Sequence, residues 1–360
     1  MPDDSRMTGE QGKVASAMAD ADAVVTGIVI AISKGFAEVR VGERTLLCTM
    51  RGKLRRRVPP ATERRGPPAN ARGGKGRSPQ PPGAPAPTEN APPPRVTPGD
   101  RVRVRPLGGA DGVIEELLPR RSELARSAGE AGGAQIMLAN LDHAALVFAV
   151  RDPVPHFGML DRYLALCERA GVAVTIVLNK IDLGDTPEIA RACALYEGLG
   201  YPVLRTSVVS GKQVAELRAR VAGRVSLLTG PSGVGKSSLI NALLPDAALR
   251  TSDVSAATGK GRHTTTGARL LALPGGGWLA DSAGIRELAL WNVPAAELAD
   301  CFVELRGRVD DCLYEDCAHS AGEEGCALRA ALVVGAITPA RYASFERLLR
   351  EARGEVDAAS

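Results

Sequence analysis

One stretch decides the fold of the central part of this chain: Gly230-Pro231-Ser232-Gly233-Val234-Gly235-Lys236-Ser237. It matches the phosphate-binding pattern G-x-x-x-x-G-K-[ST], and it lies between a predicted strand at Val225–Thr229 and a predicted helix at Ser238–Leu244. In such a loop, glycines let backbone N–H groups surround the β-phosphate, and a lysine neutralises β- and γ-phosphate oxygens. The sequence therefore predicts a nucleotide-binding domain whose phosphate contacts come from Gly230, Ser232, Gly233, Val234, Gly235, Lys236, Ser237 and Ser238.

A second motif, Asn179-Lys180-Ile181-Asp182, follows a predicted buried strand at Ala173–Asn179 and indicates the base. It resembles the N-K-x-D element of GTPases, whose aspartate accepts two hydrogen bonds from the guanine edge, and adenine lacks these donors. Alone, the four residues could equally form a strand-end turn. Beside a phosphate loop they predict GTP binding by Asn179, Lys180 and Asp182. Ser207 stands where a weaker guanine-contacting loop would lie, and a plain strand-end loop is the equal alternative.

Two further motifs resemble the switches of GTPases. Asp281-Ser282-Ala283-Gly284 follows a predicted strand at Trp278–Ala280 and resembles the D-x-x-G element, in which Asp281 would support the magnesium shell and Gly284 would meet the γ-phosphate. The glycine-flanked loop at 259–267 resembles the first switch, where Thr265 or Thr266 would coordinate magnesium. We therefore expect Mg²⁺ as a cofactor, with Ser237, Thr265 and Asp281 as its candidate ligands.

The order of these motifs along the chain differs from that of ordinary GTPases. There the phosphate loop comes first, followed by the switches and then by N-K-x-D. Here the N-K-x-D element at 179 precedes the phosphate loop at 230 and the D-x-x-G element at 281. This order predicts a circularly permuted GTPase domain of the α/β class, in which the second switch leads directly into the C-terminal part of the chain.

The candidate catalytic group lies in the first switch. Position 285, where many GTPases carry a water-orienting glutamine, is Ile285, whose side chain offers no hydrogen bond. Another group must therefore position the water, and we expect His263 to do so, with Lys236 and Asp281 completing the catalytic set. The alternative for His263 is a free loop histidine without a role in hydrolysis.

A third site is predicted near the C-terminus, where four residues form C-x4-C-x-H-x6-C: Cys312, Cys317, His319 and Cys326. Three thiolates and one imidazole fill a tetrahedral zinc site and leave no open position for catalysis, so we expect one structural Zn²⁺. The alternative is a set of scattered buried cysteines. The chain has seven cysteines in all, an odd number that argues against a disulfide framework.

The N-terminal part of the chain reads as five short strands at Val24–Ile32, Phe36–Val41, Arg44–Thr49, Arg101–Arg105 and Gly112–Leu117. This pattern predicts a small all-β barrel, most simply an OB-fold, that binds RNA or alternatively serves only to dock a protein. A proline-rich insertion interrupts the barrel, and residues 51–95 hold eleven Lys/Arg against two Glu, a local charge of +9. The insertion is either a solvated linker or a polybasic arm for phosphates.

Composition sets the remaining limits. The chain has 360 residues, 44% hydrophobic and 24% charged, with a formal charge of +4, as expected for two or three globular domains. No apolar run approaches the roughly 20 residues that a membrane helix needs, and the first residues show no apolar signal region. We therefore expect a cytoplasmic protein without a membrane contact.

Together these motifs resemble the RsgA family of ribosome-biogenesis GTPases, over about residues 24–349. The resemblance implies a GTPase that binds the small (30S) ribosomal subunit during late maturation, contacts 16S rRNA through the OB-fold and the zinc domain, and cycles between GTP and GDP. We also expect a monomer. The alternatives are a nucleotide-gated RNA-binding module in which hydrolysis is incidental, and an ATP-dependent P-loop enzyme, which Asp182 disfavours.

The expected architecture is multidomain, with an N-terminal all-β OB-fold barrel, a central α/β circularly permuted P-loop GTPase domain and a mainly helical C-terminal zinc-binding domain. Its predicted boundaries are a tail at 1–22, the barrel at 23–118 with the insertion at about 52–95, a linker at 119–139, the GTPase domain at 140–293, the zinc-binding domain at 294–352 and a tail at 353–360.

Overall fold

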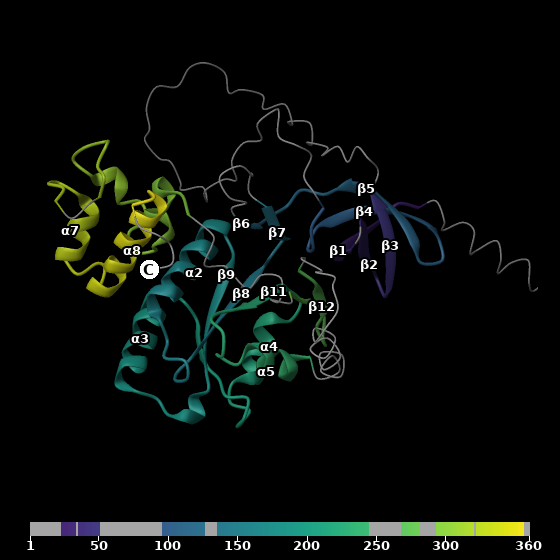
Figure 1. Ribbon diagram of the computed structural model, residues 1–360, viewed down its shortest axis with the longest axis horizontal. Coiled ribbons are helices and arrows are strands. Elements are labelled where there is room, and N and C mark those ends of the chain that lie inside the picture. The colour runs from purple at the N-terminus through teal and green to yellow at the C-terminus, as the bar shows by residue number, and fades with distance from the viewer. Residues whose placement is uncertain are drawn as a thin grey trace, which may run out of the picture. The chain divides into compact units, whose positions relative to one another are not determined.

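The computed structural model describes residues 23–33, 35–50, 96–126, 135–244, 268–280, 293–319 and 322–355. The chain divides into two compact units. The first holds the N-terminal barrel, and the second contains everything from Arg120 onward together with the short pieces Ile30–Ser33 and Thr97–Gly99. Figure 1 labels the strands and helices of both units. Each unit has its own buried core, so each is described by itself.

The first unit is a closed five-stranded barrel with strand order β1-β2-β3-β5-β4. Its strands are β1 (Val25–Ser33), β2 (Phe36–Val41), β3 (Arg44–Met50), β4 (Arg101–Gly108) and β5 (Asp111–Leu117). Branched side chains alternate with polar ones along these strands, so one face of each strand fills the barrel, as Val29, Val39, Val102, Val104 and Ile114 do with no exposed surface. The predicted all-β barrel is confirmed, with boundaries that differ from the predicted ones by up to three residues.

The second unit is built on a six-stranded sheet of order β10-β9-β8-β11-β13-β12. The strands β8 (His143–Ala149), β9 (Ala173–Asn179), β10 (Val203–Arg205), β11 (Val225–Thr229) and β13 (Trp278–Ala280) run parallel, and β12 (Leu270–Ala272) is antiparallel at the edge. All seven residues of β8 are buried, as expected for a strand that has helices on both of its faces. The predicted α/β domain is confirmed.

Two pairs of helices cover the sheet. Apolar residues of α4 (Val214–Val221) and α5 (Lys236–Leu243) pack on the face that presents Val147 and Leu228. On the opposite face, α2 (Phe157–Ala170) places Tyr163 against Phe148, with ring centroids 6.2 Å apart. The helix α3 (Pro187–Gly198) lies beside α2 and carries Tyr196 toward Phe157. The phosphate loop therefore follows a central, fully buried strand, β11.

A two-stranded sheet of β6 (Glu123–Arg126) and β7 (Gln135–Ala139) occupies part of the region predicted as a linker at 119–139. Leu124 and Leu138 are buried in it, so the region contributes apolar surface to the second unit. Gly99 shows how closely the backbone packs here: its φ is +91°, and a Cβ on it would lie 1.9 Å from the carbonyl oxygen of Ala139. Alternation over four residues is too short a pattern to have identified these strands.

Within the described residues, the C-terminal module consists of three short 3-10 turns and two helices. The turns are η4 (Ala295–Glu297), η5 (Ala299–Cys301) and η6 (Val309–Asp311), and the helices are α7 (Ala327–Val333) and α8 (Pro339–Ala352). Helix α8 begins where the Thr338 hydroxyl accepts a hydrogen bond from the backbone N–H of Arg341, and Pro339 takes the first helical position. The predicted helical character of this region is confirmed, and its core is formed by Phe302 and Phe345 in an edge-to-face pair.

No helix in the described part of the chain is long and apolar enough to span a membrane.

Candidate nucleotide and metal sites

The phosphate loop joins the carboxyl end of β11 to the first turn of α5. Two positions in this loop require glycine, because neighbouring atoms lie too close to leave room for a Cβ. A Cβ on Gly230, whose φ is +148°, would lie 1.9 Å from the carbonyl oxygen of Val147, and a Cβ on Gly235, at φ +92°, would lie 2.4 Å from Nδ2 of Asn179. The loop therefore passes directly over β8 and beside the N-K-x-D element, as a phosphate cradle at the carboxyl edge of a parallel sheet must.

Lys236 folds back over this loop. Its Nζ donates a hydrogen bond of 2.8 Å to the carbonyl oxygen of Gly230 and a second, shorter one to that of Pro231. The ammonium group is thereby held above the loop whose backbone N–H groups would donate hydrogen bonds to phosphate oxygens. Ser237 and Ser238 lie in the first turn of α5 with exposed side chains, where a hydroxyl is accessible to a metal or a phosphate.

Asn179 ties three elements together. At the end of β9, its Nδ2 donates to the carbonyl oxygen of Val234 in the phosphate loop at 2.9 Å, and its Oδ1 accepts from Oγ1 of Thr206 at 3.0 Å. Asn179, Val234 and Thr206 are all buried. The residue predicted to select guanine therefore also joins the phosphate loop to the loop after β10. Thr206 was not among the residues predicted from the sequence, in which its position directly before Ser207 is the only signal of this role.

Asp182 lies at the surface in the short turn η1 (Ile181–Leu183). Its Oδ1 accepts a hydrogen bond of 2.6 Å from Oγ of Ser207, which in turn accepts one of 3.2 Å from the backbone N–H of Ser210. The structure thus brings the two candidate guanine-contacting residues, Ser207 and Asp182, into direct contact. The bond orients the carboxylate and leaves it accessible to a base from solvent.

Lys180 adopts the left-handed conformation, at φ +62°, and its Nζ donates to the carbonyl oxygen of Asp152. Asp152 belongs to residues 150–156, the loop that joins β8 to α2, which we name the α2 loop. In the same loop the backbone N–H of Val150 donates to the carbonyl oxygen of Asn179 at 3.0 Å. The α2 loop therefore contacts the N-K-x-D element at two successive residues.

Several predicted residues lie outside the described residues: His263, Thr265, Thr266, Asp281, Gly284 and Ile285. Their roles stay predictions. The described strand β13 ends at Ala280, which pairs with Leu227 of β11 in a parallel register. The chain that leads to Asp281 therefore starts beside the strand that leads into the phosphate loop.

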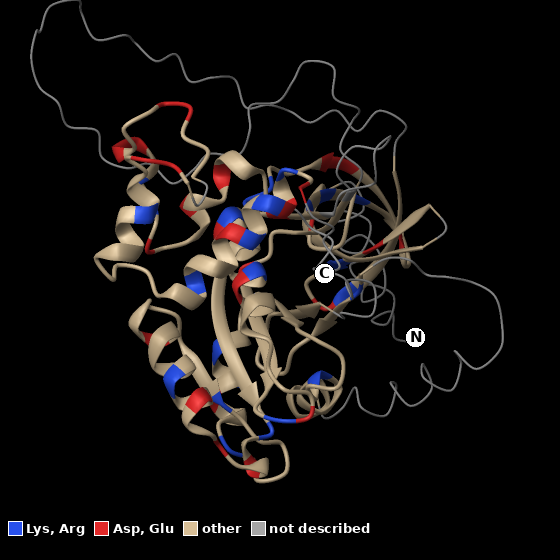
Figure 2. Cartoon of the chain, turned by 60° about the vertical axis from the view of Figure 1, so that its left-hand side comes forward, with Lys and Arg blue, Asp and Glu red and all other residues tan. Residues whose placement is uncertain are grey.

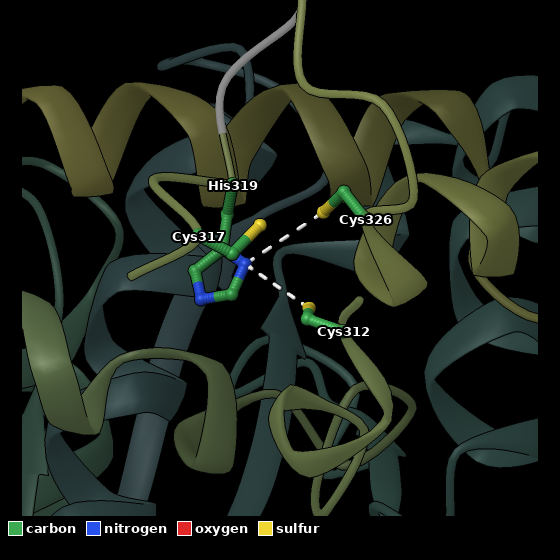
Figure 3. Close-up of side chains that lie close together, drawn as sticks. All are labelled: Cys312, Cys317, His319 and Cys326. Carbon is green, nitrogen blue, oxygen red and sulfur yellow. Dashed lines mark hydrogen bonds between the residues drawn. The ribbon is translucent and has the colours of Figure 1, made fainter. Parts of the chain in front are cut away.

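The four predicted zinc ligands converge in the C-terminal module. One ligand atom from each of Cys312, Cys317, His319 and Cys326 lies within 4.8 Å of the others (Figure 3). The Nδ1 atom of His319 is 3.6 Å from Sγ of Cys312 and 3.6 Å from Sγ of Cys326. A tetrahedral zinc ion with bonds of about 2.3 Å to sulfur and about 2.0 Å to nitrogen separates such atoms by about 3.6 Å. The donor set and its spacing therefore fit zinc.

The local backbone supports this cluster. The N–H of Ala327, in the first turn of α7, lies 3.4 Å from Sγ of Cys312, as is common where a sulfur carries negative charge. His319 has a positive φ of 54°, which turns its ring toward the three sulfurs. The remaining cysteines, Cys48, Cys167, Cys193 and Cys301, are buried elsewhere, and none of the seven forms a disulfide.

Comparisons with known proteins agree with this architecture. A family model described as RsgA GTPase matches residues 117–291. A protein of Gemmatimonas aurantiaca, named small ribosomal subunit biogenesis GTPase RsgA, is 46% identical over 260 residues, which is 71% of this chain and 84% of that protein. A Pseudomonas aeruginosa protein of the same name is 45% identical over 259 residues, covering 71% of this chain and 76% of that protein.

Solved structures show the same fold. The crystal structure of YjeQ from Thermotoga maritima aligns with a TM-score of 0.66 and 28% identity, over 92% of this chain and 99% of that one. The structure of YloQ, described as a circularly permuted GTPase, aligns with a TM-score of 0.64 and 23% identity, over 93% of this chain and 97% of that one.

Proposed function

The chain belongs to the RsgA GTPase family and is therefore a GTP-hydrolysing enzyme, and on that premise we propose that it acts on the small (30S) ribosomal subunit during its late maturation. The observation that carries the nucleotide part is the hydrogen bond of Asn179 to Val234, which joins an N-K-x-D element to a phosphate loop that follows it in the chain. The names of the relatives, at about 45% identity, support the ribosomal part.

In this proposal the phosphate loop holds GTP through Gly230, Ser232–Gly235 and the first turn of α5, and Lys236 neutralises the phosphate oxygens. Asn179, Lys180 and Asp182 select guanine, with Ser207 as a further contact, and Gly284 meets the γ-phosphate. Mg²⁺ supplies charge neutralisation at the phosphates when it is bound, and Ser237, Thr265 and Asp281 are the residues that would hold it. His263 orients the attacking water.

The zinc ion that the cluster would hold has a structural role. All four positions would be filled by protein ligands, so the site offers no position to a substrate. Because the described residues between Cys312 and Cys326 form no helix or strand, binding of the four side chains to one ion would stabilise the module.

We place the 16S rRNA contact mainly on the barrel unit. Its insertion at about 52–95 lies within residues 51–95, which carry a local charge of +9 and favour binding to phosphates by counterion release. The zinc-binding segment contributes less to this contact, because residues 309–326 carry six Asp or Glu and no Lys or Arg. Acidic residues are gathered on the loops of the C-terminal module (Figure 2). We propose a monomer that acts in the cytoplasm.

Co-sedimentation tests this function directly. The protein is pelleted with purified small subunits in GDP or in a non-hydrolysable GTP analogue, together with Lys236→Ala and a control variant, Arg191→Ala, whose side chain is exposed on α3. Binding should be several-fold greater with the GTP analogue, and Lys236→Ala should lose that difference while Arg191→Ala keeps it. Equal binding in both nucleotide states would instead support an RNA-binding module whose hydrolysis is incidental.

A further inference from the structure

The C-terminal module packs on helix α2, which contacts both α8 and the turn η5. Eight consecutive residues of α2, from Leu160 to Cys167, are buried, and these include two charged ones, Asp161 and Arg162. An ordinary surface helix exposes its charged face, so two adjacent buried charges indicate that α2 is covered on its polar side as well.

Arg341, on α8, forms the centre of this contact. Its Nε and Nη2 donate to the two carboxylate oxygens of Glu304 at 2.7 and 2.8 Å, and its Nη1 donates to Oδ1 of Asp161 at 2.7 Å. The same Asp161 oxygen accepts a hydrogen bond of 2.7 Å from the hydroxyl of Tyr196. The Arg341 guanidinium also lies 4.5 Å from the ring centroid of Phe302. The side chains of Arg341, Asp161 and Glu304 are 2%, 3% and 5% exposed.

A second buried pair lies along the same helices. Arg162 donates to Glu351, and both side chains are buried. Arg347 lies 3.8 Å from the other oxygen of Glu351 and donates to the carbonyl oxygen of Gly158, in the first turn of α2, at 3.1 Å. The two groups together contain three arginines, Arg162, Arg341 and Arg347, and three carboxylates, those of Asp161, Glu304 and Glu351. Because buried charges are tolerated only in the geometry that pairs them, this contact fixes one arrangement of α8 on α2.

The N-terminal end of α2, which carries these contacts, also reaches the nucleotide site. The α2 loop leads directly into this helix, and the imidazole of His156 caps it by accepting from the N–H of Met159 at 3.1 Å. In that loop, Asp152 accepts from Lys180, as described above. Pro153 of the same loop lies 3.5 Å from the position of a Cβ on Gly233 of the phosphate loop. A shift of α2 would therefore move groups that contact both nucleotide-binding motifs.

We propose that Arg341 is a positioning residue of the nucleotide site: it fixes α8 on α2, and α2 in turn holds its preceding loop against Lys180 and Gly233. The C-terminal module and the GTPase domain then open and close as one cooperative unit. Because such coupling is reciprocal, a nucleotide bound at the phosphate loop stabilises α8, and a partner bound to the C-terminal module alters nucleotide affinity. This inference rests on the proposed function only in that the chain binds guanine nucleotide.

Hydrogen exchange of backbone amides with and without GDP tests this coupling. If α8 opens only together with the GTPase domain, GDP at 100 times its Kd should slow the exchange of α8 amides by up to about 100-fold. In Arg341→Met the same amides should slow less than about threefold, while those of α5 remain protected by GDP. The GDP Kd of Arg341→Met should rise at least about fivefold, since the coupling acts in both directions.

Three further variants separate positioning from loss of folding. Arg350→Met, on the exposed side of the same helix, is the matched control and should behave as the wild type. Arg341→Lys keeps the charge but loses the bidentate contact with Glu304, so GDP should slow the exchange of its α8 amides more than in Arg341→Met and less than in the wild type. Tyr196→Phe removes a single hydroxyl from the contact and should weaken the response in the same direction, which keeps the test valid if Arg341→Met does not fold.

The outcomes distinguish this inference from the proposed function. Slowed exchange in both α5 and α8 of the wild type, with the α8 response reduced in Arg341→Met, supports the inference. Slowed exchange in α5 with an unchanged α8 in the wild type overturns it and leaves nucleotide binding intact. If GDP slows neither helix, the chain does not bind guanine nucleotide, and both proposals are wrong.

Discussion

Replacing Asn179 with alanine tests how the two nucleotide-binding motifs are joined. The variant removes the 2.9 Å hydrogen bond to the Val234 carbonyl and the 3.0 Å hydrogen bond from the Thr206 hydroxyl. Both partners are buried, so neither recovers a bond to bulk water without a rearrangement. Each buried polar group that loses its partner costs about 1–3 kcal/mol, so we expect a total loss of about 2–6 kcal/mol.

Two further variants examine the two bonds. Asn179→Asp keeps an oxygen that can accept from Thr206 but sets a buried carboxylate oxygen against the Val234 carbonyl oxygen, so it should cost at least as much as alanine. Thr206→Val removes only the hydroxyl, with little change in shape. Because Asn179→Ala and Thr206→Val remove the same bond, the double variant should cost less than the sum of the two single variants.

The assay is urea unfolding of the nucleotide-free protein, followed by circular dichroism, together with calorimetric titration with GDP. The free energy of unfolding should fall, and the GDP Kd should rise, with the total divided between them at about 1.4 kcal/mol for each factor of ten in Kd. Arg191→Ala serves as the exposed control. If Asn179→Ala stays within about 0.5 kcal/mol of the wild type in both measurements, the reasoning is refuted.

Three other predictions follow from the structure. Burial, reinforced by the charges of Arg224 and Arg220, lowers the pKa of His143 from 6.5 to about 4. The free energy of unfolding should therefore be highest above pH 6.5 and should fall by about 3 kcal/mol between pH 6.5 and 4. A His143→Gln variant that keeps this pH dependence in urea titrations would contradict the assignment to His143. Elemental analysis of freshly purified protein should find about one zinc ion per chain, and the Cys317→Ser variant should contain much less zinc. Less than about half a zinc ion per chain in the wild type would argue against the metal site. Asp182→Asn should raise the Kd for GTP at least tenfold, because each lost charged hydrogen bond is worth about 1.5–3 kcal/mol. An unchanged preference for GTP over ATP would show that Asp182 does not bind the guanine base.

The phosphate loop and the zinc cluster could be predicted because their functional residues lie close together in the sequence, at characteristic spacings. Glycines at 230 and 235 are needed wherever a backbone passes this close to its neighbours, and in the structure those neighbours lie 1.9 and 2.4 Å from where a Cβ would stand. Likewise, Cys312 to Cys326 hold all four ligands within fifteen residues, so the local chain alone brings them together.

The contacts that join distant segments could not be predicted in this way. Arg341 stands 180 residues from Asp161 in sequence, and nothing in the local pattern of α8 distinguishes this arginine from an exposed one. The bond between Thr206 and Asn179 spans 27 residues and depends on the pairing of β9 with β10. The hairpin of β6 and β7 was missed because each strand is only four or five residues long.

Steady-state GTP hydrolysis with and without purified small ribosomal subunits tests the central claim most directly, with large subunits and ATP as controls. The proposed function predicts at least a tenfold stimulation, equivalent to about 1.4 kcal/mol of barrier, that is specific to GTP and to small subunits. An unchanged rate with small subunits, or equal stimulation by large ones, would contradict the claim that this GTPase acts on the small subunit.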